Sequence, residues 1–290
     1  PETFARAINL ETMARQTVVV AIAAVGMTFV MIQGGIDLSV GSAVALTTVV
    51  VARMLQSGAG PFTAALVGLV VATACGTLNG TLVAKLRITP FIVTLGTMSV
   101  LRGAAKGIAD EQKIDANAQG LDELMAVLPP ELSWMLLPAG VWIALVVALV
   151  AAGLLLYTRF GRHVVAIGSN ELTARLCGVA VPRVTILVYA MAGALAGLAG
   201  VMEFGTLTVG DPTDSIGLEL EVIAAVVIGG GSLSGGKGSI AGSLIGALLM
   251  TVIKTGCTHV GVPNWVQEIL TGFIIVLAVG LDRLRQRRAG

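Results

Sequence analysis

Nine long apolar stretches divide this chain and constrain its fold more than any single motif. They can be placed at 17–33, 38–56, 62–84, 88–108, 134–157, 184–204, 220–231 with its flanks, 239–258 and 264–282. Most approach the roughly 17 to 25 residues that a helix needs to cross the hydrocarbon core of a bilayer. Because 56% of the residues are hydrophobic and only 12% are charged, the chain cannot cover a water-soluble surface. The sequence therefore predicts an integral membrane protein, with 1–290 forming one transmembrane domain in the lipid bilayer.

Helices are expected in these stretches, because backbone groups in lipid must bond within their own segment. The alternating pattern of membrane-barrel strands is absent. The predicted fold class is an all-α polytopic membrane protein with about nine transmembrane helices. Small residues spaced three or four apart, in Gly193-Gly197-Gly200 and Gly242-Gly246, predict close contacts between helices.

Lysine and arginine favour the cytoplasmic side, so their distribution gives the orientation. A cytoplasmic C-terminus collects eleven of the eighteen basic residues there: Lys85, Arg87, Arg159, Arg162, Arg175, Arg183, Lys237, Arg283, Arg285, Arg287 and Arg288. The opposite side then receives a predicted periplasmic loop, 110–133, with six acids: Asp110, Glu111, Asp115, Asp122, Glu123 and Glu131. Trp134 and Trp265 fall at outer ends of spans, and Tyr157 and Tyr189 at inner ends, where aromatic rings favour the headgroup layer.

With nine spans and a cytoplasmic C-terminus, residue 1 falls outside. We therefore expect a tenth helix to precede Pro1, and residues 1–16 to form a short amphipathic stretch on the outer surface. A surface helix at the true N-terminus is the alternative.

Catalytic and metal-binding arrangements are not visible. Three cysteines and two separated histidines form no cluster with metal-ligand spacing, so no metal site is expected. The stretch GGGSLSGGKGS resembles a phosphate-binding loop, but Gly238 follows Lys237 where serine or threonine would hold magnesium. We expect this chain to bind neither nucleotide nor nucleic acid and to be no enzyme.

Two polar, glycine-flanked breaks interrupt the apolar stretches, at Gly34–Ser42 and Gly229–Ser239. They predict broken or re-entrant segments and hint at an internal repeat, because exposed backbone is tolerated only inside protein or beside water. In the first break, Asp37 either caps the following helix or belongs to a gate. The candidates for the translocation path or gate share uncharged polar or carboxylate chemistry: Gln33, Asp37, Ser39, Asn79, Thr94 and Ser99. Each uncharged candidate could equally form a hydrogen bond between helices. Glu203 is expected to pair with Arg102 or Lys106.

A polar segment, 159–183, is the best clue to a partner, because it is long for a membrane loop and carries Glu171, Arg175 and Arg183. It predicts a short helix from about Asn170 to Leu176, capped by Ser169 or Asn170 and ended at Gly178. A rigid helix at this place can transmit a push from a soluble protein; a solvated loop without a partner is the alternative.

Four segments together resemble, in order, the permease subunits of ribose-, galactose- and xylose-type ABC importers. They are GGIDLSVGS, Thr77 to Gly103, IGSNELTARLCGVAV, and Glu219 to Ser239. The resemblance implies a ten-helix subunit of the bacterial inner membrane with both ends in the cytoplasm. It also implies a second permease subunit, identical or related, a cytoplasmic ABC ATPase that holds ATP and magnesium, and a periplasmic sugar-binding protein.

In that family the cytoplasmic loop carries a coupling helix with Glu-Ala-Ala and, four residues on, glycine. Here Glu171 and Gly178 match and the middle alanines are altered. The resemblance thus makes 159–183 a coupling loop to the ATPase, with Gly168, Asn170, Glu171, Ala174, Arg175 and Gly178 as its candidate residues. Loop 110–133 becomes a candidate landing site for the binding protein.

The expected mechanism is alternating access, in which the ATPases move the two coupling helices and open or close a path between the permease subunits for a pentose, hexose or similar solute. The alternative is a self-contained secondary transporter of a small polar solute. Such a transporter should carry a set of ion-coupling carboxylates at mid-membrane, and apart from Asp37 the sequence offers few.

Overall fold

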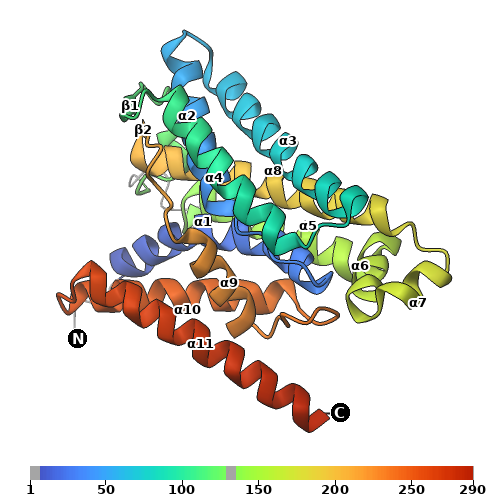
Figure 1. Cartoon of the computed structure of the whole chain (residues 1–290). Coiled ribbons are helices and arrows are strands. Elements are labelled where there is room, and N and C mark those ends of the chain that lie inside the picture. The colour runs from blue at the N-terminus through green and yellow to red at the C-terminus, as the bar shows by residue number, and fades with distance from the viewer. Residues whose placement is uncertain (1–6, 129–134, 290) are drawn as a thin grey trace.

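The computed structural model describes residues 7–128 and 135–289, and most of this part is helical (Figure 1). The helices are α1 (Ala7–Ile32), α2 (Val40–Gln56), α3 (Pro61–Leu86), α4 (Pro90–Ile108), η1 (Asp122–Leu124, a 3-10 turn), α5 (Ala139–Tyr157), α6 (Arg159–Ser169), α7 (Glu171–Leu176), α8 (Val181–Leu207), α9 (Leu218–Ile228), α10 (Ile240–His259) and α11 (Asn264–Ala289). Two short strands, β1 (Ile114–Asp115) and β2 (Val209–Gly210), pair antiparallel, with Ile114 opposite Gly210.

Each predicted apolar stretch contains a helix of the structure, so the all-helical membrane fold is confirmed. Within the described residues, five helices are long and apolar enough to cross a membrane: α1, α3, α5, α8 and α10. The number of crossings stays a prediction, because α9 has only 11 residues. At about 1.5 Å per residue it spans roughly half of a hydrocarbon core of about 30 Å.

Some expectations concern residues that lie outside the described part. These are the first six residues of the expected N-terminal stretch, Glu131, Trp134 and the side chains of the C-terminal arginines.

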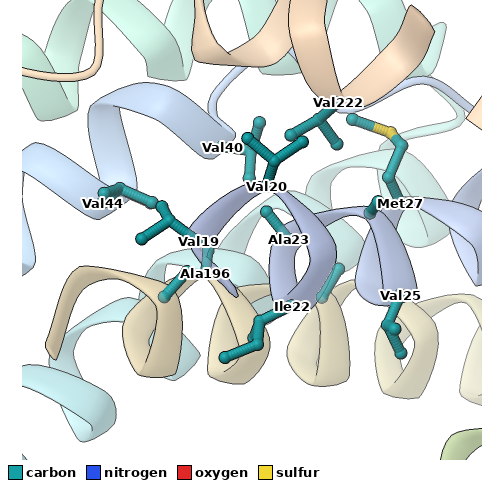
Figure 2. Packing of buried hydrophobic residues seen from close by; sticks show 14 of the residues in the cluster. Val19, Val20, Ile22, Ala23, Val25, Met27, Val40, Val44, Ala196 and Val222 are labelled. Carbon is teal, nitrogen blue, oxygen red and sulfur yellow. The ribbon is translucent and has the colours of Figure 1, made fainter. Parts of the chain in front are cut away.

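Helix α1 forms the centre of the bundle. Of its most apolar window, 83% is buried, whereas only 22% of the corresponding window of α3 is buried. Figure 2 shows Val19, Val20 and Ile22 of α1 among side chains of α2, α8 and α9. An apolar helix covered on all sides is typical of the core of a bundle.

Helices α3 and α8 pack backbone to backbone. A Cβ added to Gly193 of α8 would lie 2.9 Å from the Cα of Gly76 on α3. Gly246 of α10 likewise meets the backbone of Ala225 on α9. The predicted role of small residues in helix contacts is therefore confirmed.

The loops gather at two opposite ends of the bundle. The α7 end, as we name it, holds α6, α7 and both predicted breaks, which lie between α1 and α2 and between α9 and α10. The β end holds β1 and β2, an ion pair between Arg53 and Asp110 at 2.9 Å, and a hydrogen bond from Gln56 to the carbonyl of Asp115. Loops expected on one side of the membrane thus lie together.

At the β end, the prediction that Glu203 pairs with Arg102 or Lys106 was wrong. Arg102 donates to the carbonyl oxygens of Pro212, at 3.0 Å, and Asp214, at 2.6 Å, in the loop before α9. Glu203 lines a separate cavity with Lys254, whose ammonium pairs with Glu221 at 2.7 Å.

Candidate functional site

The predicted helix of the polar segment is present as α7, and its ends are those that the sequence indicated. The side chain of Asn170 accepts the backbone N–H of Thr173 at 2.9 Å, and Gly178 ends the turn with a φ of +85°. Glu171 and Arg175 form an ion pair at 2.6 Å across one helical turn. Asn170 and Gly178 therefore fix both ends of a very short helix.

One face of α7 is apolar and uncovered. Leu172 is 70% exposed and Leu176 is 81% exposed, whereas Ala174 is buried against the bundle. Residues four apart lie on the same side of a helix, so the two leucines form one outward patch. This patch can receive another protein.

Gly168 lies in the last turn of α6, directly before α7, and contacts the end of α1 where the first break begins. A Cβ on Gly168 would overlap the carbonyl oxygen of Ile32, the last residue of α1. That same oxygen accepts the backbone N–H of Gly236, in the second break, at 2.7 Å. No residue other than glycine fits position 168 without moving this contact.

Gly235, in the second break, also contacts Gly168 and lies close to Gly34 in the first break. Its φ is +84°, and a Cβ there would lie 2.8 Å from the carbonyl oxygen of Gly168 and 3.1 Å from the Cα of Gly34. We name the meeting of Ile32, Gly34, Gly168, Gly235 and Gly236 the glycine junction. It joins the coupling segment to both predicted breaks through main-chain atoms.

The first break is held inside the bundle by a buried polar network. One carboxylate oxygen of Asp37 accepts the backbone N–H of Ser39 at 2.8 Å and its hydroxyl at 2.6 Å. Asn79 of α3 donates to the Ser39 hydroxyl at 2.9 Å. Asp37 thus orders the turn before α2 through Ser39, the N-cap residue, but α2 has no side-chain cap bond. A role of Asp37 in capping or in gating stays a prediction.

Two path candidates on α4 lie on different faces of that helix. The Thr94 hydroxyl is buried and lies 3.2 Å from the carbonyl of Ile36 in the first break, with which it can bond. Ser99 is exposed. Five residues turn a helix by about 140°, so the two side chains cannot face one space.

Gln33 lines a cavity of about 420 Å³ at the α7 end, which we name the chamber. Its wall also includes Arg87 at the end of α3, Glu171 and Arg175 of α7, and Thr185 and Tyr189 of α8. The chamber therefore brings one predicted path residue together with two predicted coupling residues.

Tyr189 is the functional candidate that the sequence missed. It was expected in the headgroup layer but is only 2% exposed, whereas Tyr157 is 83% exposed. Its Cβ packs against Gly80 of α3, where an added Cβ would lie 2.9 Å from that of Tyr189. The signal was available in Gly76 and Gly80, whose spacing lets a facing helix approach α3 closely.

At the β end, Lys113 and Asp211 form an ion pair at 3.0 Å beside the two strands. Burial raises the pKa of Asp211, but hydrogen bonds from Thr213 and the Lys113 ammonium outweigh it and hold the pKa below its usual range. Asp211 in turn raises the pKa of Lys113. Both groups are therefore charged at neutral pH.

Comparison with known proteins gives the family. The family model described as branched-chain amino acid transport system / permease component matches residues 9–279. The ribose import permease protein RbsC of Escherichia coli (strain K12) is 39% identical over 284 residues, which are 96% of this chain and 86% of that protein. RbsC of Bacillus subtilis (strain 168) is 39% identical over 288 residues, 97% of this chain and 86% of that protein.

A third relative is the D-allose transport system permease protein AlsC of Escherichia coli (strain K12). It is 35% identical over 285 residues, 98% of this chain and 86% of that protein. No solved structure gave a significant match. The chain belongs to this family of transport-system permease components. It is therefore a multi-pass membrane permease, as the sequence predicted.

Proposed function

We propose that this chain is the membrane-spanning subunit of an ATP-driven importer that carries a sugar into the bacterial cytoplasm. Its relatives bear the names of ribose and D-allose permeases, and the resemblance extends along nearly the whole chain. In this proposal the α7 end and the C-terminus face the cytoplasm, and the protein lies in the inner membrane. The β end faces the periplasm.

The observation that carries this proposal is the placement of α7. Its exposed leucines, Leu172 and Leu176, offer a contact for a cytoplasmic ATPase, which holds the ATP and magnesium. The end of α6, directly before α7, reaches the glycine junction through Gly168. A push on the leucines is therefore delivered to both helix breaks, which is what alternating access requires.

A second permease subunit and a periplasmic binding protein complete the importer. The exposed acids of the β end, with Glu111, Asp122 and Glu123 among them, favour a binding protein that presents basic residues. Asp110 and Asp211 are already paired with Arg53 and Lys113, so they contribute less to such a contact.

Affinity purification in mild detergent tests the proposal. The wild-type chain is expected to retain an ABC ATPase, and Leu176→Asp to lose it because a charge enters the apolar patch. Val260→Asp is the matched control: Val260 is 82% exposed, against 81% for Leu176, but follows α10 at the opposite end. Retention of the ATPase by both variants would contradict the role of α7. Absence of any ATPase from the wild-type preparation would favour a self-contained transporter.

A further inference from the structure

Two residues that line the chamber each carry a buried polar atom that lacks a partner among the described residues. These atoms are the amide oxygen of Gln33 and the hydroxyl oxygen of Tyr189. The Tyr189 hydroxyl lies beside Gly35, where a Cβ would come within 2.6 Å of it. Buried polar atoms are nearly always satisfied in folded proteins, so a pair of unsatisfied ones in residues that line a cavity indicates a missing occupant.

The orientation of the Gln33 amide follows from its neighbour. The hydroxyl of Thr185 donates to the carbonyl oxygen of Val181 at 3.0 Å, so its one proton is used. Thr185 must then accept from the amide nitrogen of Gln33, which lies 2.5 Å away. The unsatisfied atom of Gln33 is therefore its oxygen, which can only accept a hydrogen bond.

We propose that the chamber is a transient binding site for a neutral monosaccharide on its way through the permease. In it, Gln33 accepts one sugar hydroxyl and Tyr189 bonds a second. The proposal rests on the proposed function and names a substrate site for it within one subunit.

The chemistry of the wall selects this class of ligand. An acceptor-only atom needs a donor, which a sugar hydroxyl supplies and a simple anion does not. Glu171 and Arg175 already pair at 2.6 Å, so Arg87 is the remaining charged side chain among the lining residues, and its guanidinium can donate to sugar oxygens. The chamber volume of about 420 Å³ lies within the usual range for small-molecule sites. Bonds between uncharged groups keep affinity modest, so the site does not retain its substrate.

The chamber also shares a wall with the coupling segment. Glu171 and Arg175 face it from α7, while Leu172 and Leu176 of the same helix are exposed to a partner. Any displacement of α7 therefore changes the shape of the chamber. Movement of the ATPase and release of the sugar are coupled through one six-residue helix.

Tyr189→Phe tests the proposal because it removes only the unsatisfied hydroxyl. The variant and wild type are reconstituted in proteoliposomes with their ATPase and binding protein, and ATP-driven uptake of D-ribose, D-allose and L-arabinose is measured. We expect the maximal uptake rate to fall by about 5-fold to 10-fold, the effect of losing one uncharged hydrogen bond. Thermal unfolding is expected to be unchanged or slightly improved, because no hydrogen bond within the described part is lost.

Two controls separate substrate contact from structure. Tyr157→Phe makes the same chemical change at the other, exposed tyrosine, and Ser42→Ala removes another unsatisfied buried hydroxyl that does not line the chamber. Both are expected to keep uptake within about 2-fold of wild type. Gln33→Met, which keeps the length of the side chain, is expected to reduce uptake as Tyr189→Phe does.

The outcomes distinguish the two proposals. Normal uptake by wild type and by both chamber variants would overturn the sugar site and leave the importer intact. A loss of uptake that follows a loss of thermal stability in both variants would also overturn it. No ATP-dependent uptake by the wild-type complex would overturn the proposed function and the chamber with it.

Discussion

The carbonyl oxygen of Ile32, at the end of α1, accepts the backbone N–H of Gly236, 204 positions further along the chain, at 2.7 Å. Gly168 lies against the same oxygen. One main-chain atom thus connects the central helix of the bundle, the second helix break and the segment that leads into α7. In the proposed importer this atom lies on the route from the ATPase to the path.

Gly168→Ala is expected to break this connection. The added methyl group overlaps the Ile32 oxygen, and overpacking of this kind typically costs about 1 to 3 kcal/mol. We expect ATP-driven uptake to fall at least about 10-fold, since 1.4 kcal/mol corresponds to a factor of ten. Gly153→Ala on α5 is the control, because a Cβ there meets nothing within 4 Å. Equal uptake by the two variants would count against the junction.

Asn170→Ala is expected to loosen α7. Loss of an N-cap side chain costs about 1 kcal/mol, a large share of the stability of a six-residue helix. Sugar-stimulated ATP hydrolysis should decrease several-fold, and Asn170→Ser, which retains a capping oxygen, should restore most of it. Identical rates for both substitutions would show that the cap is not the cause.

Ser39→Ala is expected to destabilise the first break. It removes one hydrogen bond from the buried carboxylate of Asp37 and leaves the Asn79 amide without its acceptor. The expected cost is about 1 to 3 kcal/mol, seen as a lower midpoint in thermal unfolding in detergent. Ser99→Ala, on the exposed face of α4, should change stability by less than about 0.5 kcal/mol. A similar midpoint for both variants would contradict the network.

The ion pair of Asp211 predicts a pH dependence at the β end. Because the pKa of folded Asp211 lies below its unfolded value, the ionised carboxylate stabilises the fold above the unfolded value of about 3.9. This stabilisation is lost as the pH falls below that value and through the folded pKa. Asp211→Asn should therefore lower stability by about 1 kcal/mol at pH 7 and have little effect near pH 2.

The matched control for this prediction is Asp122→Asn, at an exposed carboxylate of the same loop. Thermal unfolding is measured for both variants across the acid range. A stability difference for Asp211→Asn that stays constant from pH 7 down to the acid limit would show that the carboxylate charge is not responsible.

Much of this architecture could be predicted because backbone groups in lipid must form hydrogen bonds within their own segment. An apolar stretch must be a helix, and the glycine-flanked breaks could be located because they interrupt that pattern. The ends of α7 were predictable for a local reason, since Asn170 and Gly178 act on their own neighbouring backbone.

The parts that failed depend on contacts between distant segments. Tyr189 was expected at the membrane interface from its position in a span, and only the close approach of α8 to α3 shows that it is buried. Composition could not show which way Ser99 faces, because the rotation of a helix is set by its neighbours. The sequence likewise gave no sign that Gly168 and Gly236 meet.

The glycine junction is built from main-chain atoms, so its chemistry does not depend on which side chains surround it. At Gly168 a substitution can abolish the contact but cannot weaken it gradually, since even a Cβ already overlaps the Ile32 oxygen. We therefore expect substitutions that adapt this permease to another solute or another ATPase to lie outside this position. Side chains whose size and polarity can change in small steps are those of the chamber wall and of the exposed face of α7.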